Sequence, residues 1–173
     1  MRRMFAAAAL VLAAFSAPVL ADVTTVRWDR VEGVVGADYM PVQVGPFAAS
    51  GRWRTTGPGT VMLNLRTGFL SVRVTGISVA NHYPNAPLGS PTPPNKGNVI
   101  LTVVCHSTER YGPMTWADAT VPGGVGSLNW QGFLNLPTAC VDYPEELVFL
   151  VRHLEGPPFY GAFMLYGAER SIR

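Results

Sequence analysis

The two-residue alternation of residues 60–75, "TVMLNLRTGFLSVRVT", constrains the fold of this chain more than any other feature. Apolar side chains recur at every second position on both sides of a short break, at Val61, Leu63, Leu65, Leu70, Val72 and Val74. Successive side chains of a β-strand point to opposite faces, so this period places all six on one face. Between the two runs lies Thr67-Gly68, and glycine readily adopts the positive φ that a tight hairpin requires. The segment is therefore predicted to form a β-hairpin with one buried face.

Further strands are predicted at residues 23–28, 40–44, 49–55, 98–106, 127–136, 146–153 and 159–166. In residues 127–136, Leu128 and Trp130 belong to the apolar side of the alternation, whereas Phe133 interrupts the polar side. No window has the apolar period of an amphipathic helix, and the 18 Gly and 15 Pro residues suit a chain with many turns. We predict an all-β fold, a single-domain antiparallel β-sandwich or partly open barrel with long Pro-rich loops, over residues 22–173.

The first residues have the pattern of a secretory signal peptide. Arg2 and Arg3 precede an apolar run, and Val19-Leu20-Ala21 offers small residues for cleavage after Ala21. An uncleaved membrane anchor is the alternative, but the run is short for a bilayer span of about 20 residues. We therefore expect residues 1–21 to be removed and the protein to be secreted or periplasmic, without a membrane span after signal removal.

The charge of the mature chain argues against nucleic acid as a partner. Two of the 13 Lys and Arg residues, Arg2 and Arg3, belong to the signal, which leaves 11 basic and 11 acidic residues. Lys96 is the only lysine, and the sequence has no obvious basic cluster. Nucleic-acid binding requires a clustered basic surface, so we expect no such partner.

Two cysteines, Cys105 and Cys140, remain in the mature chain. In an oxidising compartment such a pair favours a disulfide over two thiols, and it is too small a ligand set for a structural metal site. We predict that Cys105 and Cys140 are bonded to each other.

The sequence has no recognised catalytic or metal-binding motif. A zinc site commonly holds two ligands close together on one element, but no H-x-H, H-x-x-x-H or H-E-x-x-H occurs, and neither does a G-x-S-x-G elbow. The sequence therefore favours a non-enzymatic protein with no cofactor and no metal. An enzyme or metal site would need the histidines to meet a carboxylate through tertiary folding, from among His82, His106, His153, Glu109, Asp118 and Asp142.

Four residues near the long loops are candidates for ligand binding. Residues 82–97 contain five prolines, too many for a central strand, and a loop of this length is either functional or mobile. Exposed aromatic rings on loops bury a large area at low entropic cost when they bind sugars or partner proteins. The candidates are His82, Tyr83, Tyr111 and Trp116; alternatively, Trp116 caps the core and His82 only ends a strand.

The order of these segments resembles the CHRD domain. The stretch "GTVMLNLRTGFLSVRVTGISVANH" is similar to two consecutive strands of that family, and "FLNL" and "GAFMLYGAER" are similar to later ones. Ala80-Asn81-His82 corresponds to the family's "A-H-I-H" segment, with Pro84 in place of the second histidine. The resemblance implies an immunoglobulin-like β domain.

Taken together, these features favour an exported β domain that binds a protein, an envelope component or a glycan without transforming it. One alternative is a small hydrolase or metal-binding protein with a site at the loop end of the sandwich. Another is a self-assembling envelope or coat subunit whose strand edges pair between copies.

Overall fold

The computed structural model describes residues 24–34, 43–49, 53–79, 96–106, 113–124, 126–154 and 162–173. Its strands are β1 (Thr25–Gly33), β2 (Gln43–Val44), β3 (Phe47–Ala48), β4 (Trp53–Thr55), β5 (Gly59–Asn64), β6 (Phe69–Val79), β7 (Lys96–Val104), β8 (Trp116–Gly124), β9 (Gly126–Phe133), β10 (Val148–His153) and β11 (Phe163–Ile172). Two short helices, α1 (Thr138–Asp142) and the 3-10 helix η2 (Pro144–Glu146), precede β10. The predicted signal peptide, residues 1–21, lies outside the described residues, as does the Pro-rich segment 82–95.

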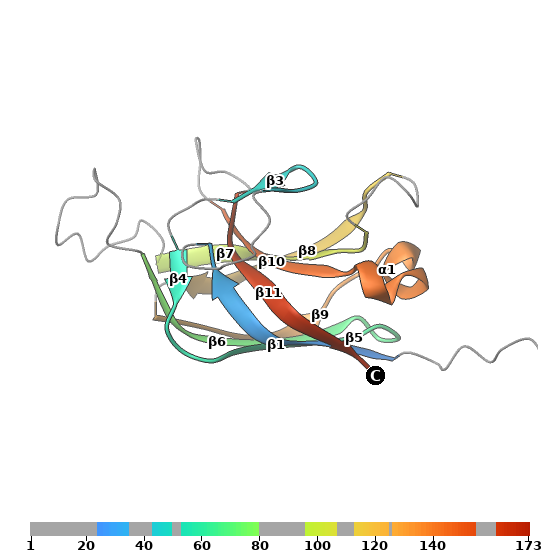
Figure 1. Ribbon diagram of the computed structural model, residues 1–173, viewed down its shortest axis with the longest axis horizontal. Coiled ribbons are helices and arrows are strands. Elements are labelled where there is room, and N and C mark those ends of the chain that lie inside the picture. The colour runs from blue at the N-terminus through green and yellow to red at the C-terminus, as the bar shows by residue number, and fades with distance from the viewer. Residues whose placement is uncertain are drawn as a thin grey trace, which may run out of the picture.

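The strands form an antiparallel sheet that folds into two packed layers, which confirms the all-β, sandwich-like prediction. The sheet order is β4-β6-β5-β1-β11-β10-β7-β8, and β9 also pairs with β6. Figure 1 shows β7, β8 and β10 above β1, β5, β6 and β9. Strand β11 crosses between the layers, because its first residues pair with β10 and its later ones with β1.

The predicted hairpin of residues 60–75 is confirmed as β5 and β6. The side-chain oxygen of Asn64 accepts the backbone N–H groups of Arg66 and Thr67 at 3.0 and 2.9 Å, which shapes the turn. Gly68 completes it with a φ of 74°, a conformation that favours glycine. Asn64 and Gly68 therefore fix the register that buries the alternating apolar side chains of both strands.

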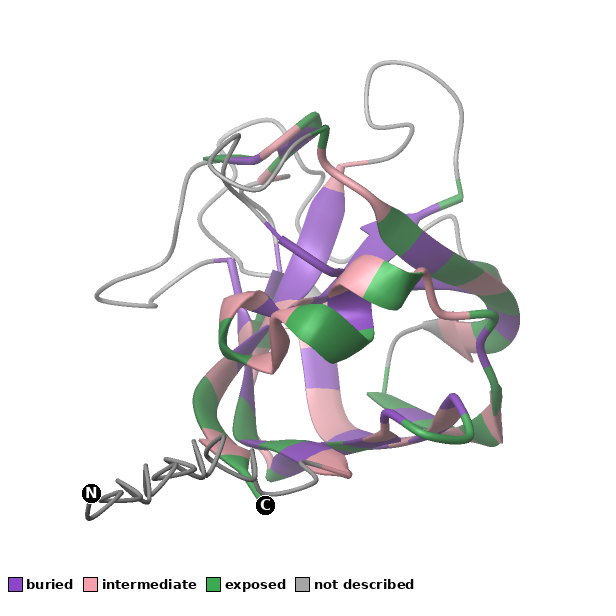
Figure 2. Ribbon diagram, turned by 90° about the vertical axis from the view of Figure 1, so that its right-hand side faces the viewer, coloured by how far each residue is buried: buried purple, intermediate pink, exposed green. Residues whose placement is uncertain are grey.

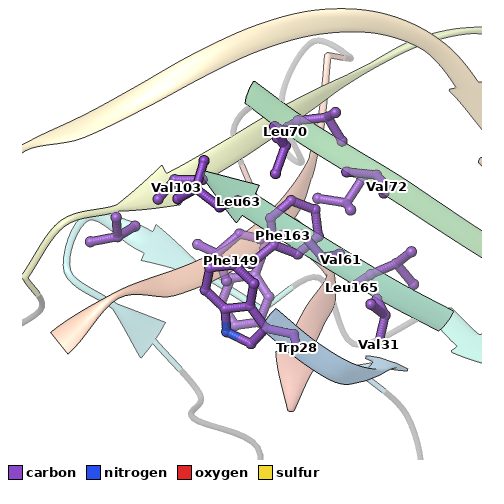
Figure 3. Close-up of a cluster of buried hydrophobic side chains, with 14 of the residues drawn as sticks. Trp28, Val31, Val61, Leu63, Leu70, Val72, Val103, Phe149, Phe163 and Leu165 are labelled. Atoms are coloured by element: carbon purple, nitrogen blue, oxygen red, sulfur yellow. The ribbon is translucent and has the colours of Figure 1, made fainter. Parts of the chain in front are cut away.

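The core lies between the two layers and consists of the inward residues of each strand (Figure 3). Trp28 of β1 meets Phe149 of β10 with ring centroids 5.8 Å apart. Gly167 of β11 allows this contact, because a Cβ there would lie 2.7 Å from the Trp28 ring. Figure 2 looks onto the end where α1 lies and shows buried and exposed residues alternating along the strands.

Two features depart from the sequence prediction. Strand β8 was not predicted, because its inward residues are Ala117, Ala119, Val121 and Gly123, and such small side chains give little apolar signal. Helix α1 has only five residues, which is too short to display a helical period. Among the described residues, no helix has the length and apolar character needed to cross a bilayer.

Candidate functional site

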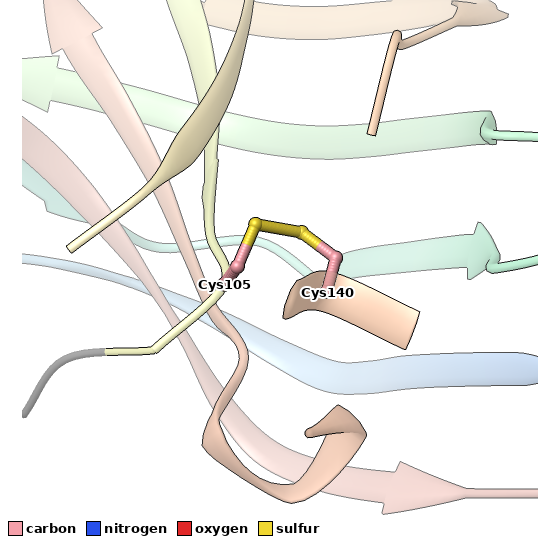
Figure 4. The surroundings of a disulfide bond; sticks show 2 residues. All are labelled: Cys105 and Cys140. Atoms are coloured by element: carbon pink, nitrogen blue, oxygen red, sulfur yellow. A yellow bond between two sulfur atoms is a disulfide. The ribbon is translucent and has the colours of Figure 1, made fainter. Parts of the chain in front are cut away.

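The structure confirms the predicted disulfide and places it at one end of the sandwich. Cys105 follows β7 and Cys140 lies on α1, and their sulfur atoms are bonded (Figure 4). Both residues are fully buried. The bond anchors the short helix to the sheet, and it leaves neither cysteine of the chain as a thiol nucleophile or metal ligand.

Among the four predicted ligand-binding residues, Trp116 is the one that the structure describes. His82, Tyr83 and Tyr111 lie outside the described residues. Trp116 begins β8 with 40% of its surface exposed, whereas Trp28 and Trp53 are 1% and 3% exposed. The exposed ring lies on the outer side of the β7, β8 and β10 layer, so it does not cap the core between the layers.

The hairpin of β2 and β3 lies above this layer (Figure 1). The ring of Phe47, on β3, meets the Trp116 ring edge to face, with centroids 5.2 Å apart. Val44 and Phe47 are both buried, although they lie on the outer side of the sheet, where side chains normally face water. The hairpin therefore adds a third, partial layer over the outer face of the sandwich.

Beneath the hairpin lies a buried network around Arg152 of β10. Its Nε donates to the Thr102 hydroxyl and its terminal nitrogen to the Asp118 carboxylate, both at 2.6 Å. The Thr102 hydroxyl in turn donates to the second Asp118 oxygen at 2.7 Å. The Arg152 side chain is only 9% exposed, and the Phe47 ring covers its guanidinium at 4.2 Å. A buried guanidinium needs such partners, so the network holds the hairpin and three strands in one arrangement.

Trp116 and Asp118 together form a small exposed surface. They are two residues apart on β8 and share its outer face, so their Cα atoms lie about 7 Å apart. The Asp118 side chain is 36% exposed, and each of its oxygens accepts one bond within the network. A carboxylate has about four acceptor positions, so a ligand over the Trp116 ring can donate to the remaining ones. The ion pair with Arg152 holds Asp118 in a fixed position, so its carboxylate is suited to accept hydrogen bonds from a ligand.

The histidines that the structure describes do not converge. His153 of β10 is opposite Val99 on β7, whereas His106 follows the far end of β7, roughly 20 Å away along the extended chain. His153 is buried, and its Nε2 accepts the indole N–H of Trp53 at 2.8 Å. Among the described residues, no three His, Cys, Asp or Glu side chains are placed to hold a metal ion.

Sequence reasoning missed Arg152 and Phe47, the residues that hold Asp118 and the Trp116 ring in place. The available signal for Arg152 was its position in "LVFLVRH", where an arginine follows five apolar residues in a row. A buried arginine requires partners, but the sequence cannot identify them, because Thr102 and Asp118 belong to other strands.

Comparison of the chain with protein-family models, with characterised proteins and with solved structures gave no significant match.

Proposed function

We propose that this chain is an exported, non-enzymatic binding domain that holds a protein or glycan partner against the Trp116 surface, formed by Phe47, Trp116 and Asp118. The observation that carries the proposal is the exposure of Trp116, since tryptophan is usually highly buried. Export is supported by the disulfide, which is typical of oxidising compartments, and by the signal pattern of residues 1–21.

The surroundings of Trp116 favour recognition by a rigid surface. Phe47 contacts the ring on one side, and the Arg152 network anchors Phe47. A side chain that is already immobilised loses less conformational entropy on binding than a free one. Tryptophan is also among the residues that most often dominate binding energy at interfaces.

The proposal can be tested with the mature protein, residues 22–173, and its Trp116→Ala variant. We expect wild type to bind at least one component of an envelope extract or of a glycan array that Trp116→Ala no longer binds, while the variant still unfolds cooperatively on heating. Val141→Ala is the matched control, because Val141 on α1 is an apolar side chain that is 49% exposed and is not part of the Trp116 surface. Equal binding of every component by wild type and Trp116→Ala would refute the role of this surface.

A further inference from the structure

Acidic residues are absent from a large part of the chain. No Asp or Glu occurs between Asp38 and Glu109, although this stretch contains four arginines and Lys96. It supplies β5 and β6 of the lower layer and β4, which pairs with the end of β6; β9, which also pairs with β6, has no charged residue at all. We call the outer surface of these four strands the β6 face. Among its described residues, every charged side chain is positive.

The strand register arranges the β6 face in rows. Phe69 of β6 is opposite Phe133 of β9, so their side chains share one face. Two residues farther along, Ser71 is opposite Gln131 and Met62, and the next row contains Arg73, Asn129 and Thr60. The inward neighbours Leu70, Val72 and Val74 are fully buried, which confirms that the rows point outward.

An aromatic pair occupies one end of this face. The rings of Phe69 and Phe133 meet edge to face with centroids 5.5 Å apart. Phe133 is 69% exposed, the highest value among the large exposed hydrophobic side chains of the described residues, and Met62 nearby is 42% exposed. Exposed apolar groups gathered at one place on a surface commonly mark a binding site.

The remaining rows offer hydrogen bonds and a positive charge. Gln131 donates to the Ser71 hydroxyl at 3.3 Å, and Asn129 and Arg73 are exposed beside them. Within the described part of the chain, Arg73 makes no ion pair, in contrast to Arg27 of β1, which binds Asp29 at 2.5 Å. Arg73 is four positions beyond Phe69 on the strand, so the aromatic and cationic ends are about 14 Å apart.

We propose that the β6 face binds an acidic oligosaccharide, with a sugar ring against Phe133 and a carboxylate of the chain on Arg73. Arginine binds carboxylates with two parallel hydrogen bonds, and the amides and hydroxyls between the two ends match the hydroxyls of sugars. The cores of protein interfaces are more apolar than this row of Ser, Gln, Asn and Thr, which favours a saccharide over a peptide. The lack of acidic residues on the face matches a negatively charged ligand.

The β6 face is separate from the Trp116 surface of the proposed function, because their strands β6 and β8 belong to opposite layers of the sandwich (Figure 1). Either surface can fail its test while the other passes. Trp116→Ala therefore serves as a control for the β6 face, and Phe133→Ala reports on the β6 face alone.

The test measures binding of oligogalacturonate to the mature protein by calorimetry, with neutral dextran, polyglutamate and phosphatidylglycerol vesicles as comparison probes. We expect oligogalacturonate to bind, and to bind more weakly at higher salt because the charges are exposed. Phe133→Ala and Arg73→Gln should each weaken this binding about fivefold or more, the loss typical of a residue that contributes to an interface. Trp116→Ala, a change in the opposite layer, should leave it unchanged.

Several results would overturn the assignment. Absence of oligogalacturonate binding, or equal affinity for dextran, would remove the acidic saccharide as the ligand. Polyglutamate or lipid vesicles bound as tightly would show that charge alone is recognised. Wild-type affinity in the Phe133→Ala and Arg73→Gln variants would place any binding elsewhere; because both side chains are exposed, these variants should fold normally, which their melting temperatures will verify.

Discussion

The Arg152 network predicts an asymmetry between its two charged partners. In Asp118→Asn, the buried guanidinium keeps its charge but loses its counter-ion. Breaking a buried pair in this way costs about 3–5 kcal/mol, and the 36% exposure of Asp118 lets water recover part of that loss. We therefore expect the free energy of unfolding to fall by about 3 kcal/mol. Arg152→Met removes the buried charge itself and leaves Asp118 in contact with water, so we expect a loss of only about 1–1.5 kcal/mol.

Urea unfolding of both single variants and of the double variant measures this asymmetry. The slope of free energy against urea should stay constant, so that midpoint shifts report stability. The double variant should be less destabilised than the sum of the singles, because Asp118→Asn costs little once the guanidinium is gone. A larger loss for Arg152→Met than for Asp118→Asn, or strictly additive effects, would refute the view that the buried guanidinium depends on Asp118.

Three further predictions concern other parts of the fold. Replacing Cys105 and Cys140 by serine should lower stability by about 4 kcal/mol for a sequence separation of 35 residues, measured by urea unfolding, and mass analysis should find no free thiol in wild type. Trp53→Phe removes the buried indole donor to His153 and should cost about 1–3 kcal/mol; an unchanged melting temperature would contradict this. Glu169 has a φ of 53°, so Glu169→Gly should be about 1 kcal/mol more stable than Glu169→Ala, although both lose the same ion pair. Equal stability of these two variants in urea would exclude backbone strain at this position.

The chain determines its β-hairpin and its all-β class through local rules. The alternation of residues 60–75 requires one buried face, and Asn64 and Gly68 supply the turn, so strands β5 and β6 follow from neighbouring residues alone. The disulfide was also predictable, because a predicted export signal together with a single pair of cysteines leaves few other roles for them. Phe133 was visible as an apolar residue on a polar side, and the structure places it outward.

Tertiary structure alone decided which of these residues form surfaces. The burial of Arg152 depends on a hairpin more than 100 residues earlier in the chain, and Trp116 keeps its exposure because Phe47 supports the ring from the side and does not cover it. His106 and His153 are both buried, yet the antiparallel pairing of β7 with β10 sends them to opposite ends of the sandwich. Sequence patterns record the period of each strand, whereas partners on different strands are selected by the order and register of the whole sheet, to which every strand contributes.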